Sequence, residues 1–155
     1  MTLENTLLEK LSEWRPGPGR QELQVAAAGW RVTVTADRSD VLGCLLWELN
    51  LQRDGSAKVD LQAWAANAAA SITGLMEPLK VVEVDSSRQE AQLRSESPLE
   101  RGDKRFYYEL LLNGLGIATL RRFQTLNGGG KRAQTTYALT HEVLTKLVGD
   151  LTASV

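Results

Sequence analysis

The chain has 155 residues, a net charge of −1 at pH 7, 43% hydrophobic side chains and one cysteine. This length supports one hydrophobic core, so we expect a single domain over residues 1–155. One cysteine excludes an internal disulfide, and a charged, amphipathic start predicts neither a signal peptide nor a membrane span. We therefore expect a cytoplasmic protein.

The first third of the chain predicts a helix and then three strands. Thr2 can cap a helix that runs to about Trp14 with its leucines on one face, and Pro16-Gly17-Pro18-Gly19 ends it. Apolar and polar residues then alternate over 21–28 and from Trp30 to Ala36, which is typical of half-buried strands.

Residues 41–53 fit two interpretations. A helix would place Val41, Leu42, Leu45, Leu46 and Leu49 on one stripe. We favour a strand, because the segment lies between turns at 37–40 and 54–56. That strand would put Leu45, Trp47, Leu49 and Leu51 on one face, and Leu42, Cys44 and Leu46 on the other.

Residues 61–76, LQAWAANAAASITGLM, carry no charged side chain and six alanines. With Asp60 as N-cap and Pro78 as terminator, they predict a helix that is buried on all sides. One face would cover a sheet. Its small-residue face, Ala63, Ala66 and Ala70, would contact either another helix of this chain or the same helix of a second subunit.

The remaining chain predicts five strands and a helix. The strands are expected at 79–84, 89–94, 106–112, 117–125 and 132–139, with a charged loop at 96–104. Asn113-Gly114 and the Gly-rich segment 127–130 predict hairpin turns. Thr140 caps a last helix whose apolar face is Val143, Leu144, Leu147, Val148 and Leu151.

The order α-βββ-α-βββββ-α indicates an α+β fold, with helices packed on a mainly antiparallel sheet. In order of elements and size it resembles the class I type III secretion chaperones and their relatives. That resemblance implies a small cytoplasmic α+β dimer that binds an extended segment of a secreted protein. The pI of about 5.9 and the extra strands before the last helix depart from the family pattern.

Few residues suggest catalysis or metal binding. His141 is the single histidine, and it is expected to be partly exposed at the start of the last helix; Cys44 is expected to be a small core side chain. No zinc-ligand spacing is present, so neither a metal nor a cofactor is expected. Glu48 and Glu109 interrupt apolar strands. They point either to solvent or, with Tyr108, into a pocket between sheet and helices.

Four basic residues form the better binding candidate. Arg121, Arg122, Lys131 and Arg132 would meet at one end of a hairpin formed by 117–125 and 132–139, near Phe123 and Tyr137. The first interpretation of these four residues is a simply solvated surface. If they do bind a partner, an acidic protein or peptide is favoured over nucleic acid. The hypothesis that follows is a non-enzymatic protein- or peptide-binding module; the alternative is a small-ligand-binding protein or an enzyme.

Overall fold

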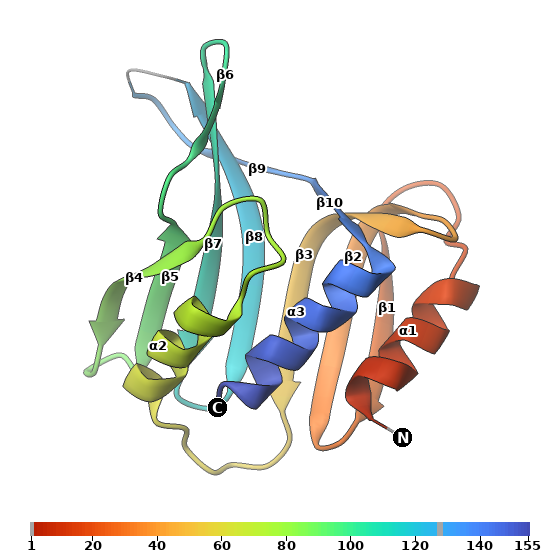
Figure 1. The fold of residues 1–155 in the computed structure, drawn as a ribbon, viewed down its shortest axis with the longest axis horizontal. Coiled ribbons are helices and arrows are strands. Elements are labelled where there is room, and N and C mark those ends of the chain that lie inside the picture. The colour runs from red at the N-terminus through yellow and green to blue at the C-terminus, as the bar shows by residue number, and fades with distance from the viewer. Residues whose placement is uncertain (1, 127–128) are drawn as a thin grey trace.

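The computed structural model describes residues 2–126 and 129–155. It is an α+β fold in which three helices lie on one face of a large antiparallel sheet (Figure 1). The helices are α1 (Leu3–Glu13), α2 (Leu61–Ser71) and α3 (His141–Ala153). Thr2, Asp60 and Thr140 cap their N-termini by accepting the backbone N–H three residues later. The predicted fold class and all three caps are therefore confirmed.

The described strands form one sheet with the spatial order β1-β2-β3-β8-β7-β5-β4, and β6, β9 and β10 lie off this path. Their bounds are β1 (Gln21–Ala27), β2 (Trp30–Ser39), β3 (Gly43–Arg53), β4 (Leu79–Asp85), β5 (Glu90–Ser95), β6 (Leu99–Arg101), β7 (Lys104–Asn113), β8 (Ile117–Leu126), β9 (Ala133–Thr135) and β10 (Tyr137–Thr140). The segment expected as a charged loop thus contains β6, which forms a hairpin with the start of β7.

The segment β9–β10 fills the fork between β3 and β8. The second half of β3 pairs with the first half of β8, and beyond that point the two strands separate. In the fork, β9 pairs with the end of β8, and β10 pairs with the start of β3. The single strand predicted over 132–139 is split in two because it changes partner.

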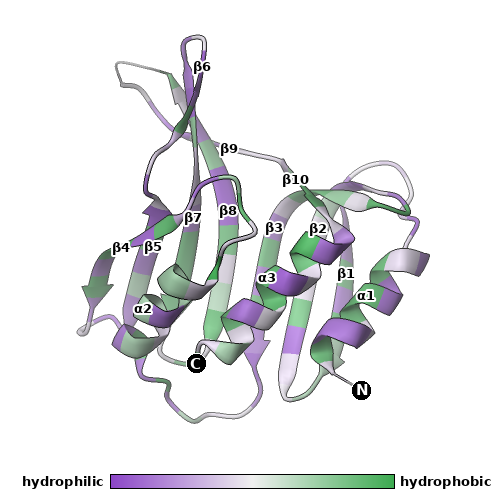
Figure 2. Ribbon diagram, viewed as in Figure 1, coloured by the Kyte–Doolittle hydropathy of each residue, from purple (hydrophilic) through white to green (hydrophobic). Residues whose placement is uncertain are grey.

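The core lies between the sheet and the helices. Leu7, Val32, Leu46, Trp64 and Leu147 are at most 1% exposed and belong to one cluster of buried residues. In Figure 2, α1 and α3 show hydrophobic bands next to hydrophilic ones, as expected of helices with one buried face. The opposite face of the sheet carries no helix (Figure 1), which is common for antiparallel sheets.

The central helix is shorter and more exposed than predicted. It ends at Ser71, with Ile72 as C-cap, although the prediction ran to residue 76. Its Ala63, Ala66 and Ala70 are exposed, so burial on all sides is wrong for this chain by itself. Ile72 and Leu75 are nevertheless buried, because the chain beyond the helix stays against the core.

Strand β3 corrects the predicted faces of residues 41–53. The strand interpretation is right, but Cys44, Leu46, Leu49 and Leu51 all face the core. A bulge makes this possible: Thr35 of β2 pairs with Glu48 while Ala36 pairs with Leu46, which leaves Trp47 as an extra residue. An extra residue reverses the alternation of the side chains that follow it.

The turn between β7 and β8 also differs in detail from the prediction. Residues 113 and 114 lie at this turn as expected, but the residue with positive φ is Gly116 (φ 84°). Asn113 instead accepts the backbone N–H groups of Leu115 and Ile117 with its side-chain oxygen. Of the other predicted turn, residues 127 and 128 lie outside the described residues.

In the described part of the chain, each helix is too short or too polar to span the apolar layer of a bilayer.

Candidate functional site

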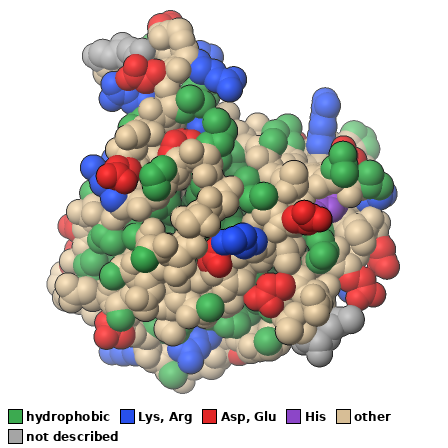
Figure 3. Space-filling model, viewed as in Figure 1, with side chains coloured by type: hydrophobic (Ala, Val, Ile, Leu, Met, Phe, Trp, Pro, Cys, Tyr) green, Lys and Arg blue, Asp and Glu red, His purple; other side chains and the backbone are tan. Residues whose placement is uncertain are grey.

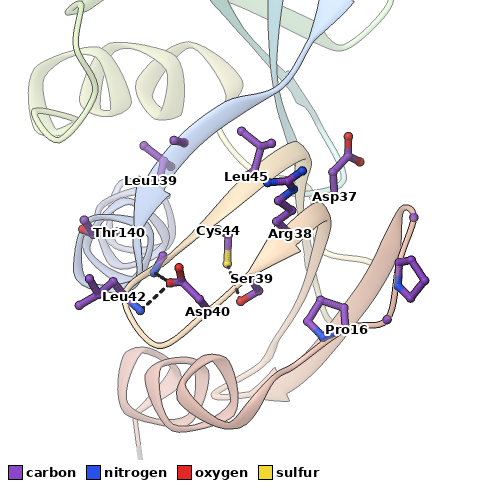
Figure 4. A pocket seen from close by; sticks show the side chains of 15 residues that line it. Pro16, Asp37, Arg38, Ser39, Asp40, Leu42, Cys44, Leu45, Leu139 and Thr140 are labelled. Atoms are coloured by element: carbon purple, nitrogen blue, oxygen red, sulfur yellow. Dashed lines mark hydrogen bonds between the residues drawn. The ribbon is translucent and has the colours of Figure 1, made fainter.

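A large open groove lies at the end of the β2–β3 hairpin, with a volume of about 830 Å³ (Figure 4). We call it the hairpin groove. The loop after α1, the hairpin end and β10 build it together. It is lined by Pro16, Gly17, Pro18, Gly19, Asp37, Arg38, Ser39, Asp40, Leu42, Gly43, Cys44, Leu45, Ala138, Leu139 and Thr140.

Asp40 shapes the hairpin end that forms one wall of the groove. Its Oδ1 accepts the backbone N–H groups of Leu42 at 2.8 Å and Gly43 at 3.0 Å (Figure 4). These two hydrogen bonds lower the pKa of the Asp40 carboxyl, which stays charged at neutral pH. The turn exposes Val41 and Leu42, which are 68% and 74% exposed. Two aliphatic side chains therefore stand in solvent beside the groove.

The other wall approaches the hairpin closely at Gly43. A Cβ atom on Gly43 would lie 2.7 Å from the carbonyl oxygen of Leu139 in β10. Only glycine allows this backbone approach without a shift. The backbone N–H of His141 also donates to the carbonyl of Leu42 at 2.9 Å. The start of α3 and the hairpin are thus held together behind the groove.

The two candidate nucleophile or acid–base residues lie close to the groove but are buried. Cys44 is 4% exposed, and burial raises the pKa of its thiol, which lies 3.3 Å from the Ser39 hydroxyl. His141 is also 4% exposed, so the expected partial exposure is wrong. Burial lowers the pKa of His141, and its Nε2 has no hydrogen-bond partner among the described residues. Both groups are therefore uncharged at neutral pH.

The structure separates the four basic residues that the sequence singled out. Arg122 faces the helices and is 6% exposed, paired with the buried Glu77. Arg121, its neighbour in β8, lies on the uncovered face and pairs with Glu48 at 3.5 Å. Arg132 and Lys131 precede β9, where both are exposed. Alternation along β8 rules out a single cluster of all four.

Arg132 belongs instead to a network around Glu109 on the uncovered face. Glu109 is only 3% exposed, and its Oε2 accepts from Arg132 at 2.5 Å and from Gln92 at 3.0 Å; Arg94 lies 3.4 Å away. A hydrogen bond with Tyr107 and the pair with Glu109 raise the pKa of Arg132. The network fastens the chain before β9 onto β7.

The positions of Glu48, Glu109 and Tyr108 test the alternative hypothesis of a pocket between the sheet and the helices. Glu48 and Glu109 point to the uncovered face, where they pair with arginines. Tyr108 points to the helices and packs edge-on against Tyr137, with 5.6 Å between ring centres. The three polar groups expected to line that pocket do not converge. Among the described residues, no group of His, Cys, Asp and Glu side chains is arranged to hold a metal ion.

Sequence reasoning missed the groove, although two signals for it were present. The sequence predicts only a break at Pro16-Gly17-Pro18-Gly19, and it places Val41 and Leu42 only within a regular strand or helix. In the structure β2 continues to Ser39, and Val41 and Leu42 lie in the turn itself, where both are exposed.

The chain was also compared with known proteins, and no family model, curated protein or solved structure matches it.

Proposed function

We propose that this protein is a non-enzymatic module that binds an extended, apolar segment of a partner protein in the hairpin groove. The observation that carries the proposal is the groove itself, which is open to solvent and bordered by Leu42 with 74% of its surface exposed. Small-molecule sites enclose most of their ligand, whereas an open apolar groove suits a polypeptide that continues past it.

The polar groups of the groove support a peptide rather than a polar small molecule. Asp40 is occupied by two backbone N–H groups, and Asp37 pairs with Arg20 at 2.8 Å. The Ser39 hydroxyl is within hydrogen-bond distance of the Cys44 thiol. These groups shape the walls. The guanidinium of the exposed Arg38 has no partner among the described residues, so it and the aliphatic side chains form the contact surface for a partner.

The uncharged state of Cys44 and His141 supports a role without catalysis. A nucleophilic cysteine needs a lowered pKa, and the pKa of Cys44 is raised. A general base must reach its substrate, and His141 is buried behind the groove. The resemblance to class I secretion chaperones, which bind extended segments as dimers in the cytoplasm, supports the same kind of partner, compartment and assembly for this chain.

Leu42 provides the direct test. Peptides selected by the wild-type protein from a displayed random library should be apolar. Leu42→Glu should weaken their binding about tenfold or more, because it places a charge beside the apolar partner. Leu42 is exposed, so the variant should remain folded by circular dichroism.

Leu115→Glu is the matched control, because Leu115 is 55% exposed in the β7–β8 turn and outside the groove. Equal weakening by both substitutions, or a selection that returns no peptide, would refute the proposal. Leu42 replaced by a photo-crosslinking residue should attach to the selected peptide, and crosslinking at position 115 alone would refute the groove as the site.

A further inference from the structure

The ends of β6, β7 and β8 project from the body of the protein as an arm (Figure 1). We define the β-arm as residues 99–106, 123–126 and 129–132. It carries five basic and two acidic side chains, so its net charge is +3, while the rest of the chain has a net charge of −4. Figure 3 shows Lys and Arg side chains on both sides of the arm. The protein is therefore a dipole with its positive end on a projecting element.

Some of the arm's positive charges are neutralised within the protein and others are not. Arg105 pairs with Glu100 at 3.0 Å, and Arg132 pairs with Glu109. Within the described part of the chain, Lys104 and Lys131 have neither an ion-pair nor a hydrogen-bond partner. These two ammonium groups are free to bind an anion from outside.

A small hollow brings these two lysines to one place. It has a volume of about 150 Å³ and is lined by Lys104, Gln124, Thr125, Leu126, Lys131 and Ala133. Leu126 pairs with Lys104 across β7 and β8, and it is 54% exposed. Two ammonium groups next to one exposed aliphatic side chain match a carboxylate that is followed by an apolar residue.

The aromatic rings near the arm indicate which kind of polyanion fits. Single-stranded nucleic acid needs rings on which its bases can stack. Here the guanidinium of Arg132 lies 3.9 Å from the centre of the Phe123 ring, and that of Arg94 lies 5.3 Å from the Tyr107 ring. Phe123 is also only 7% exposed. The acidic body would in addition repel a long, uniformly charged strand.

We propose that the β-arm is a second binding site, which takes an acidic and partly apolar segment of a partner protein, with a carboxylate between Lys104 and Lys131 and an apolar side chain on Leu126. This site is distinct from the hairpin groove. A partner that contacts both sites would gain affinity from the connection between them.

The test uses a labelled peptide of alternating Glu and Leu, with binding followed by fluorescence anisotropy. Wild-type protein should bind it, and added salt should weaken the binding. Lys104→Glu with Lys131→Glu should weaken it about tenfold or more, because two attractions become repulsions. The variant should keep its fold, since the described structure shows both side chains exposed and unpaired.

The matched control is Lys58→Glu with Lys80→Glu. It changes the net charge by the same amount at two exposed lysines of the body, so it should bind nearly as wild type. Equal weakening in both variants, no binding by wild type, or tighter binding of a single-stranded oligonucleotide would overturn the proposal. Leu42→Glu should leave the binding of this peptide unchanged, so failure of one site is distinguishable from failure of the other.

Discussion

The carboxylate of Glu77 and the guanidinium of Arg122 form an ion pair with 3.0 Å between Oε1 and Nη1, although their side chains are only 8% and 7% exposed. The Ser95 hydroxyl donates to the same Oε1 at 3.1 Å and accepts the backbone N–H of Tyr108 at 2.8 Å. The guanidinium also lies over the Tyr108 ring, 4.2 Å from its centre. This network fixes the segment between α2 and β4 to the sheet.

Removing one partner of this pair should therefore be costly. Glu77→Leu should lower the free energy of unfolding by about 4 kcal/mol, because it leaves the Arg122 charge buried and unpaired. Glu77→Leu with Arg122→Met should cost less than the single substitution, since no buried charge remains. Urea unfolding measures both. As a control, Glu83→Leu on exposed β4 should change stability by less than about 0.5 kcal/mol. A Glu77→Leu effect as small as the control's would contradict this account of the pair.

The buried side chain of His141 should make the free energy of unfolding depend on pH. Its pKa in the folded protein lies below the ordinary value of 6.5, mainly because it is buried, so the unfolded chain binds the proton more tightly. The contribution of His141 to stability is therefore complete above about pH 6.5 and is lost as the pH falls through the folded pKa.

Urea unfolding of wild type and His141→Gln at several values between about pH 7.5 and pH 5.5 measures this effect. The free energy of unfolding of wild type should decrease more steeply towards acid than that of the variant. The carboxylates titrate in both proteins and contribute a common slope. Parallel curves would mean that His141 takes up its proton equally well in the folded state.

We predict that two copies of the chain associate through the exposed face of α2. No element among the described residues covers Ala63, Ala66 and Ala70, and small side chains permit close approach of a second α2 across a two-fold axis. If this face forms a dimer, Ala66→Glu with Ala70→Glu should sediment as a folded monomer where wild type sediments as a dimer. Circular dichroism should show unchanged helix content, because the substituted side chains point to solvent in the isolated chain. A wild-type protein that sediments as a monomer at high micromolar concentration would refute the predicted dimer.

Local signals in the sequence were sufficient for most of the architecture. Thr2, Asp60 and Thr140 are caps in the structure, because a cap depends only on a side chain and the first turn of its own helix. The alternation from Trp30 to Ala36 likewise predicted which face of β2 is buried. Such elements follow from residues that are neighbours along the chain.

The candidate sites were harder to predict, because they depend on residues that are distant in sequence. The hairpin groove combines the Pro16–Gly19 loop with Asp40 and with β10. The small hollow of the β-arm combines Lys104 with Lys131. The sequence singles out Lys131 as one of four basic residues of a hairpin, and it does not connect Lys131 with Lys104. The periodicity of one segment does not indicate which distant segments lie beside it in the fold.

The sequence by itself determined the α+β class, the order of the three helices and of most strands, and the apolar faces of β2 and α3, since these follow from periodicity and caps. In α1 it placed Leu3, Leu7 and Leu11 on the buried face, but Leu8 is 38% exposed. Only the tertiary structure decided that an extra residue at Trp47 puts Leu49 and Leu51 on the same face as Leu46. It also decided that α2 ends at Ser71 and that Arg122 is buried while Arg121 is not. The physical reason is the same in each case: burial depends on which distant strand or helix lies opposite a residue, and here that partner outweighs the local pattern.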